Sequence, residues 1–171
     1  MLRLVEPSSG LRAAWLEAHR EWGDGQHEDG FGIRPTDELE STSGFAAWLK
    51  RLELDSGPAH RGAHRCIYRW IMSDDSVVGG IALRYGTSDY VRTSGHIGYG
   101  IRPSARGRGI ATWALGEILK LARDQGLERV LLVCESDNAA SAATIVRNGG
   151  RSDDGAEDGM SRYWIELHDP T

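Results

Sequence analysis

The chain has 171 residues, of which 40% are hydrophobic and 26% are charged, and its formal net charge is −5. This length suits one domain with a substantial core, and we expect that domain to span residues 1–171. The net negative charge disfavours general affinity for nucleic acid, and no apolar stretch is long enough to span a membrane. We therefore expect neither nucleic acid nor a membrane as a partner.

The two cysteines, Cys66 and Cys134, lie far apart in the sequence and have no metal-ligand spacing. They predict neither a disulfide framework nor a metal site, which fits a reducing cytoplasm. The apolar run at the start of the chain is interrupted by Glu6 and Pro7, so it does not read as a secretory signal. The expected location is therefore the cytoplasm.

The first third of the chain predicts a strand and two helices. Residues 2–5 form the strand, and apolar residues recur at helical spacing from Leu11 to Trp22. A long, acidic, glycine-rich loop follows over residues 23–32. Thr42 or Ser43 is a candidate cap for the second helix, which ends at 56–58.

A hairpin is expected next. Residues 66–72 are rich in aromatic and β-branched side chains, residues 74–76 form the turn, and residues 77–85 return as the partner strand. Gly79-Gly80 predicts a bulge or a close backbone approach within that strand. Residues 86–94 read as a polar loop.

Residues 95–150 are the stretch around which the chain is organised. The pattern there predicts a strand closed by Pro103, a turn, a helix that begins at Ile110, a buried strand over 130–134 and a helix over 139–148. Gly126 fits the position just beyond the end of the first helix. This order argues a parallel, right-handed crossover.

The last segment predicts a hairpin, with a short strand at 151–152 and a longer one over 161–167. Together the elements indicate the α/β (α+β) class, with a central mixed, mostly antiparallel sheet and helices on both faces.

The turn after Pro103 carries the chemistry. A helix N-terminus leaves backbone N–H groups unpaired and bears partial positive charge. Gly107 and Gly109 permit a close approach of a ligand to the backbone, and Arg106 and Arg108 add positive charge. The turn therefore predicts a phosphate or pyrophosphate site, although Thr112 stands where a dinucleotide fingerprint needs a glycine.

The spacing Arg106-x-x-Gly109-x-Ala111 resembles the signature of the GNAT superfamily of acyl-coenzyme A-dependent N-acetyltransferases. Asn138-x-x-Ser141 and Arg147-x-Gly149 follow at the places where this family carries similar pairs. The resemblance covers about a third of the chain. It implies the GNAT fold, in which the strands ending near Ile101 and Cys134 form a splayed parallel pair and acetyl-coenzyme A lies in the gap.

The resemblance also implies which residues hold the cosubstrate. The pyrophosphate would rest on the turn, and the pantetheine arm would run beside the backbone of Tyr99 and Ile101. The complete expected set is Tyr99, Ile101, Arg106, Gly107, Arg108, Gly109, Ile110, Ala111, Thr112, Asn138, Ser141 and Arg147. Asn138 is equally suited to cap the helix that follows it.

His96 is the candidate general base. It shares one face of its strand with Gly98 and Gly100, and an unperturbed His has a pKa of about 6.5, suited to taking a proton from an ammonium group. Many members of the family carry a Glu near this point. The alternative is a hydrogen-bonded histidine that orients the strand.

The general acid is less clear from the pattern. The family often has a Tyr seven residues after the Asn, but Ile145 stands there. Tyr163 or Tyr99 could replace it, or the departing thiolate could take its proton from water.

The acceptor would bind near the acidic loop, where relatives build that site. Trp22, Asp24, Glu28 and Asp29 are its candidate residues, because carboxylates can hold a cationic amine. The alternative is a solvated loop.

The sequence thus predicts an acyltransferase that moves an acetyl group from acetyl-coenzyme A to a primary amine by direct attack, without a metal. The acceptor would be a small molecule or a peptide. The alternative is a non-catalytic module that binds coenzyme A as a sensor or scaffold. The sequence leaves open whether the protein is a homodimer.

Overall fold

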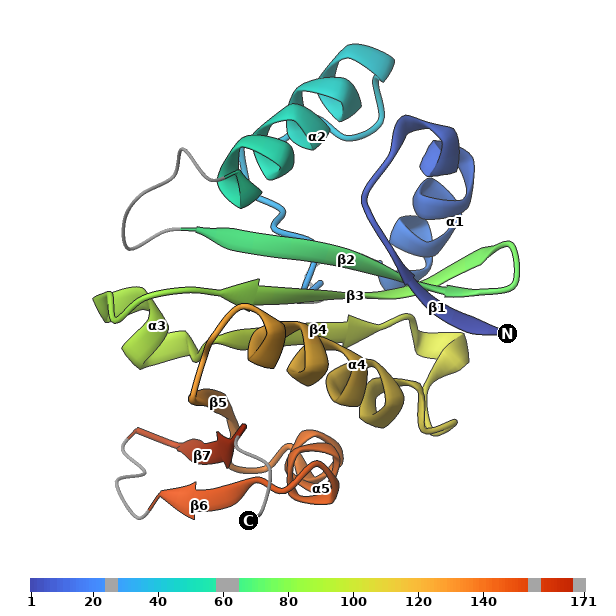
Figure 1. The fold of residues 1–171 in the computed structure, drawn as a ribbon. Helices are drawn as coiled ribbons and strands as arrows, with labels where there is room; N and C mark the ends of the chain where they lie inside the picture. Colours follow the sequence, from blue (N-terminus) through green and yellow to red (C-terminus); the bar gives the residue numbers. More distant parts are fainter. Residues whose placement is uncertain (24–27, 58–64, 154–157, 168–171) are drawn as a thin grey trace.

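The computed structural model describes residues 1–23, 28–57, 65–153 and 158–167, whose strands form two antiparallel sheets. The first sheet has the order β1-β2-β3-β4. Its strands are β1 (Leu2–Val5), β2 (Cys66–Ser73), β3 (Ser76–Arg84) and β4 (Ile97–Ile101). Figure 1 shows α1 (Arg12–Trp22) and α2 (Thr42–Ser56) above this sheet, and α4 (Ile110–Asp124) against its other face.

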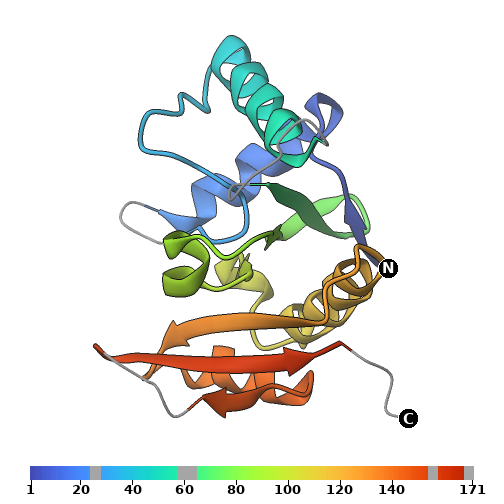
Figure 2. The ribbon, with the colours of Figure 1, turned by 60° about the vertical axis from the view of Figure 1, so that its left-hand side comes forward.

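The second sheet has the order β5-β7-β6. Its strands are β5 (Arg129–Glu135), β6 (Arg151–Asp153) and β7 (Met160–Glu166). Helix α5 (Ala139–Arg147) packs behind it (Figure 2). The short helix α3 (Asp89–Ser94) precedes β4 and contacts β5.

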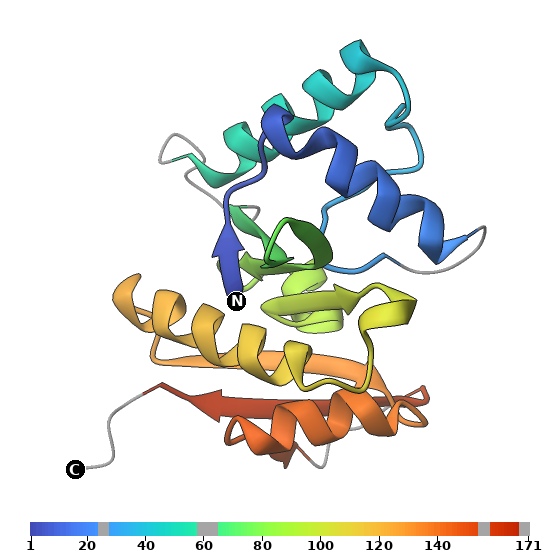
Figure 3. The same cartoon turned by 90° about the vertical axis from the view of Figure 1, so that its right-hand side faces the viewer.

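The two sheets meet at one point. Strands β4 and β5 share no ladder, and an isolated antiparallel bridge between Gly95 and Leu132 joins them just before β4 begins. Helix α4 runs back between them, so both strands lead toward the same end of the molecule (Figure 3). The expected fold class is confirmed. The ladders among the described strands are all antiparallel and none joins β4 to β5, so the splayed parallel pair stays a prediction.

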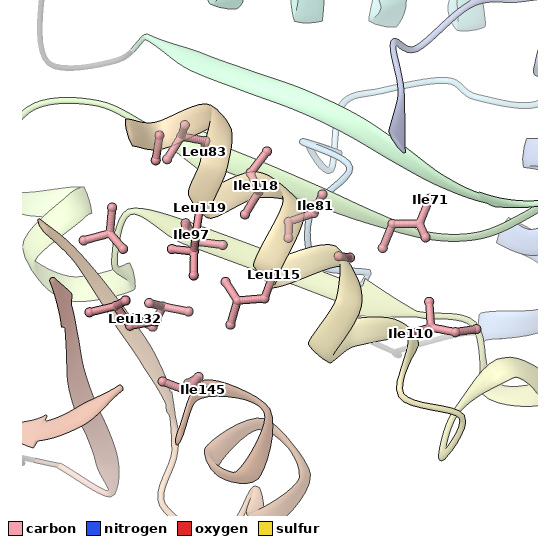
Figure 4. Packing of buried hydrophobic residues seen from close by; sticks show 14 of the residues in the cluster. Ile71, Ile81, Leu83, Ile97, Ile110, Leu115, Ile118, Leu119, Leu132 and Ile145 are labelled. Carbon is pink, nitrogen blue, oxygen red and sulfur yellow. The ribbon is translucent and has the colours of Figure 1, made fainter. Parts of the chain in front are cut away.

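Apolar side chains fill the space between the sheets. Figure 4 shows α4 contributing Leu115 and Ile118 to a core that also receives Ile97 from β4, Leu132 from β5 and Ile145 from α5. This core holds the two sheets together although they share a single bridge. The same core also fixes the positions of β4 and β5 relative to each other.

A second core under α1 and α2 is rich in aromatic residues. Trp15 and Trp48 lie with their ring centroids 4.6 Å apart, and Trp70 from β2 stacks on both. Phe31 and Phe45 complete the cluster. These three tryptophans are at most 1% exposed, and large aromatic rings contribute much apolar area when buried.

Most predicted elements appear at their expected places, but two details were wrong. Residues 89–94 form α3 and not a polar loop, because the Ser88 hydroxyl accepts the backbone N–H of Val91 and starts a helix. Helix α2 is capped by Ser41 and not by Thr42 or Ser43, since the Ser41 hydroxyl accepts the N–H of Gly44.

The glycine pair of β3 meets both parts of its prediction. The register of β2 and β3 shifts between Ile71 and Met72, which is a bulge beside Gly79. A Cβ on Gly80 would lie 2.7 Å from the ring of Phe31, so this glycine permits the close approach of the loop that follows α1.

Candidate active site

A cleft of about 1050 Å³ opens between β4 and β5. Its walls are β4, β5, the turn before α4, the first turn of α4 and helix α5, and residues of α3 and of the loop after α1 complete its lining. This volume is at the upper end of the range for small-molecule and cofactor sites. Within the described residues, no group of three His, Cys, Asp or Glu could hold a metal ion.

The start of α4 is an open anion site. Gly107 and Gly109 adopt left-handed φ angles of 72° and 73°, and a Cβ on either would meet no atom within 4 Å. Gly109 is the N-cap and provides no side-chain hydrogen bond, so the first N–H groups of the helix face the cleft without a side-chain cap. Because the first turn also lacks acidic residues, this end fits a pyrophosphate.

The turn that leads to α4 is fixed from both sides. The Arg106 Nε donates to the carbonyl of Ile101 at 2.9 Å. On the other side, the Glu21 carboxylate of α1 accepts Arg102 Nε at 2.6 Å and the Ser104 hydroxyl at 3.0 Å. The turn is therefore held in place by the protein's own contacts, so a ligand would meet it largely pre-formed.

The structure brings most of the predicted cosubstrate residues together. Arg108 is exposed and is the member of the predicted set that does not line the cleft. The set that lines it is Tyr99, Ile101, Arg106, Gly107, Gly109, Ile110, Ala111, Thr112, Asn138, Ser141 and Arg147.

Asn138 caps α5, as predicted for its structural role. Its side-chain oxygen accepts the N–H of Ser141 at 3.0 Å. Asn148, at the other end of the helix, donates to the carbonyls of Thr112 and Thr144 and so links α5 to α4. These bonds fix the wall of the cleft that α5 provides.

Of the two candidate general acids, Tyr99 lies in the cleft. Its hydroxyl donates to the carbonyl of Ser141 at 3.5 Å, and burial raises its pKa to about 12. Tyr163 is paired with Leu132 in the second sheet and does not line the cleft. Ile145, at the family's usual tyrosine position, is 1% exposed and belongs to the core.

His96 lies at the junction of the sheets, not in the cleft lining. Its Nδ1 accepts the N–H of Leu131 at 2.9 Å, and its ring also bonds to the backbone of Gly86. Burial lowers the pKa of His96. A ring whose Nδ1 accepts a hydrogen bond carries no proton on that nitrogen and is neutral, which is the arrangement of the strand-orienting alternative. The catalytic role stays a prediction.

The glycine face of β4 is covered by protein. The guanidinium of Arg84 lies over Gly98, and the backbone of Asp29 lies over Gly100, in each case too close to admit a Cβ without a shift. The side chain of Arg84 and the loop after α1 therefore cover this face of the strand.

The acceptor candidates are divided by the structure. Trp22 and Asp29 line the cleft. Glu28 instead turns to His19, whose Nδ1 lies 2.8 Å from both carboxylate oxygens, and this pairing raises the pKa of His19. Asp24 lies outside the described residues.

Several cleft residues have no counterpart in the sequence prediction. Arg84, Tyr90, Thr93 and Ser94 line the end near α3, and Glu135 lines the β5 wall. The Ser88 cap with Asp89 in the first turn was a helix signal that could have revealed α3. Nothing local marks Arg84, because its position depends on the pairing of β3 with β4.

The two sheets, the cleft between them and the uncapped N-terminus of α4 define an acyl-coenzyme A-dependent transferase of the GNAT type. The family model described as "Acetyltransferase (GNAT) domain" matches residues 25–151, and the chain belongs to this family. A search of curated proteins finds no match.

Many solved structures share this fold, among them the acetyltransferases RimL, RimJ and MccE. RimL, a ribosomal L7/L12 alpha-N-protein acetyltransferase in complex with coenzyme A, has a TM-score of 0.70 at 16% identity, over 96% of this chain and 93% of that one. Mycobacterium smegmatis RimJ, in complex with CoA-disulfide, has a TM-score of 0.69 at 21% sequence identity, and the match covers 96% of this chain and 81% of RimJ. The microcin C7 self-immunity acetyltransferase MccE, in complex with acetyl-coenzyme A and AMP, has a TM-score of 0.66 at 18% sequence identity. That match covers 96% of this chain and 92% of MccE.

Proposed function

We propose that this protein is an N-acetyltransferase that binds acetyl-coenzyme A in the cleft between β4 and β5 and transfers its acetyl group to a primary amine. The observation that carries the proposal is the open N-terminus of α4, where two left-handed glycines and Arg106 border a cleft of about 1050 Å³. Solved structures of the same fold hold acetyl-coenzyme A or coenzyme A, which supports this choice of ligand.

In this proposal the first turn of α4 and Arg106 hold the pyrophosphate. The wall from Asn138 to Ser141 and the edge of β4 around Tyr99 and Ile101 border the pantetheine arm. Acetyl-coenzyme A, when bound, supplies an activated thioester. The chain's own contribution is to hold thioester and amine in line and to exclude water, which supplies much of the rate gain.

Direct transfer is favoured over a covalent enzyme intermediate. Cys134 lines the cleft, but burial raises the pKa of its thiol, so little thiolate is present near neutral pH. An amine acceptor can attack the thioester without help from this residue. We therefore propose direct transfer, in which the amine nitrogen bonds to the acetyl carbonyl carbon, the thioester C–S bond breaks and the coenzyme thiolate departs.

We assign the proton for the departing thiolate to Tyr99. Its hydroxyl lies in the cleft and is bonded to the first turn of α5, and its raised pKa keeps it protonated at neutral pH. For the amine proton, His96 is a poor acceptor because the N–H of Leu131 occupies its Nδ1 and the residue does not line the cleft. Asp29 and Glu135 line the cleft, and we assign the amine proton to one of these carboxylates or to cleft water.

A direct test mixes the protein with acetyl-coenzyme A and a panel of amines and follows thiol release, with mass spectrometry of the products. Release that depends on an amine, with acetylated product, supports the proposal. Tight coenzyme A binding by calorimetry without transfer to any amine would favour the sensor or scaffold function. If coenzyme A did not bind, the cleft would not be a coenzyme A site and the proposal would be wrong.

A further inference from the structure

Arg84 places a positive charge in the cleft at the end remote from the α4 turn. It is the last residue of β3, and its guanidinium lies over the backbone of Gly98 in β4. A Cβ on Gly98 would come within 2.7 Å of the Arg84 Nη2, so the glycine is what lets the arginine occupy this position. Arg84 and Gly98 therefore form one unit of the cleft wall.

The guanidinium is held on several sides. Its Nη1 donates to the carbonyl of Gly95 at 3.2 Å and reaches that of Ser94 at 3.5 Å, and the ring of Tyr90 stacks on it at 5.1 Å. All these contacts come from α3 and the residue after it. Arg84 is thus a pre-organised cation, and a bound group would not need to pay for ordering this side chain.

The charge has no anionic partner in the described part of the chain. The ion pairs found there involve the N-terminus, His19, lysines and other arginines, and none places a carboxylate within 4 Å of Arg84. Its hydrogen bonds to carbonyl groups are made by Nη1, Nη2 lies over Gly98, and the residue lines the cleft. A half-buried cation of this kind favours an anion from outside the protein.

The anion is better matched by a carboxylate than by a phosphate. Phosphate groups usually draw several cations, whereas the other arginines of the cleft belong to the turn before α4 and to the end of α5. Thr93 and Ser94, which line the cleft beside Arg84, are neutral. One cation with neighbouring hydroxyl-bearing residues suits a single carboxylate.

We propose that the acceptor amine carries a carboxylate that Arg84 binds. This inference rests on the proposed acetyl transfer and adds the class of acceptor. Two sources would present the group: the main-chain carboxylate of a free amino acid, or an acidic side chain close to the N-terminus of a peptide.

The test compares matched acceptors in the wild type and in Arg84→Gln. Leucine and phenylalanine are paired with their C-terminal amides, and a Ser-Glu peptide amide is paired with Ser-Gln. Within one variant, each ratio of kcat/KM also reflects the basicity of the two amines. Comparing the ratio between variants cancels that contribution. We expect Arg84→Gln to reduce the preference for the carboxylate member of the favoured pair by roughly 10- to 100-fold, as for a lost hydrogen bond to a charged group.

Arg162→Gln is the matched control. Its Nη1 donates to the carbonyl of Arg92, so it also supports α3, but it does not line the cleft. The control should leave the preference unchanged. If Arg84→Gln lowers the rates for acids and amides by the same factor, or if neither pair type shows a carboxylate preference in the wild type, Arg84 serves α3 alone and the inference is wrong.

A binding measurement separates this inference from the proposed reaction. N-acetyl-leucine, N-acetyl-phenylalanine and N-acetyl-Ser-Glu amide are titrated against their uncharged partners in the presence of coenzyme A. Tighter binding of the acids that disappears in Arg84→Gln supports the carboxylate site even if no amine is acetylated. Equal binding of acid and uncharged partner in every pair would overturn it.

Discussion

His96 and Leu131 exchange two hydrogen bonds across the junction of the sheets. The N–H of His96 donates to the carbonyl of Leu131 at 2.7 Å, and the N–H of Leu131 donates to His96 Nδ1 at 2.9 Å. The bridge between Gly95 and Leu132 lies beside them. Beyond this point the two strands separate and the cleft begins, so His96 sits where the separation starts.

Replacing His96 should therefore affect stability before it affects chemistry. His96→Ala leaves the buried N–H of Leu131 without its acceptor, which costs about 1–3 kcal/mol. His96→Asn retains an acceptor near the Nδ1 position and should recover part of that loss. Urea unfolding of the three proteins measures the difference. If His96 were the general base, both variants would instead lose about 10²- to 10⁴-fold in kcat/KM at unchanged stability.

The pH dependence of unfolding provides a second check on His96. Its pKa is lowered in the folded state, so the unfolded chain binds the proton more readily. The stabilisation is then complete above the unfolded pKa of about 6.5 and is lost as the pH falls below it. We expect His96→Asn to lose stability less steeply than the wild type between pH 7 and pH 5. Parallel curves would mean that another group causes the acid sensitivity.

Gly109→Asp should weaken acetyl-coenzyme A binding strongly. The side chain would project from the N-cap of α4 into the open space that the proposal gives to the pyrophosphate. Gly109→Asn is the matched control, because it bears the same φ of 73° and a side chain of nearly the same shape without the charge. Calorimetry should give a dissociation constant at least about tenfold higher for the Asp variant, from one like charge near the anion. Equal constants would contradict a phosphate site at this turn.

The sequence was most informative where local pattern decides structure. The apolar run of β5, the helical spacing of α4 and Gly126 beyond its end all specify their own conformation. In the structure, the N–H of Gly126 bonds to Arg123 and that of Leu127 to Ala122, as such a helix end requires. The helix cap at Asn138 belongs to the same class.

Features that depend on tertiary contacts could not be read in this way. Helix α3 has six residues and a single buried side chain, Val91, so beyond the local signal of its Ser88 cap it has no apolar periodicity that would identify it as a helix. The hydrogen bonds of His96 depend on how far β4 and β5 separate. The partnership of Glu28 with His19 depends on the path of the loop after α1. None of these is encoded in the spacing of neighbouring residues.

The acidic loop residues should behave differently from one another. Glu28→Gln removes the carboxylate that raises the pKa of His19. Stabilisation from a raised His pKa is present below the unfolded value and is lost as the pH rises through the folded one, so the variant should be destabilised chiefly at acidic pH. Asp29→Asn, in the cleft lining, should instead raise the acceptor KM. Thermal unfolding at two pH values and acceptor kinetics on both variants separate these effects.

Coenzyme A affinity serves as the control for the two loop variants, since neither residue lies at the α4 turn. We expect it to be unchanged in both. If the acceptor KM rose in Glu28→Gln and stayed unchanged in Asp29→Asn, Glu28 and not Asp29 would be the residue that contacts the acceptor.

Tyr99→Phe tests the proposed general acid by removing one hydroxyl. The phenol is bonded to the carbonyl of Ser141, and burial raises its pKa to about 12, so it remains protonated across the pH range of an assay. We expect kcat to fall by roughly 10²-fold, the lower end for a lost general acid, with little change in coenzyme A affinity. Tyr163→Phe, outside the cleft, should keep the wild-type kcat.

The choice of acyl donor shows whether the hydroxyl gives its proton or only shapes the cleft. A thiol of low pKa leaves readily as its anion, so an acetyl thioester of such a thiol needs less help from an acid. The deficit of Tyr99→Phe should therefore shrink as the pKa of the leaving thiol falls, because the lost proton matters less. A deficit that is the same for every donor would make Tyr99 a positioning residue for α5. If Tyr99→Phe were as fast as the wild type with acetyl-coenzyme A, water and not Tyr99 would protonate the departing thiolate.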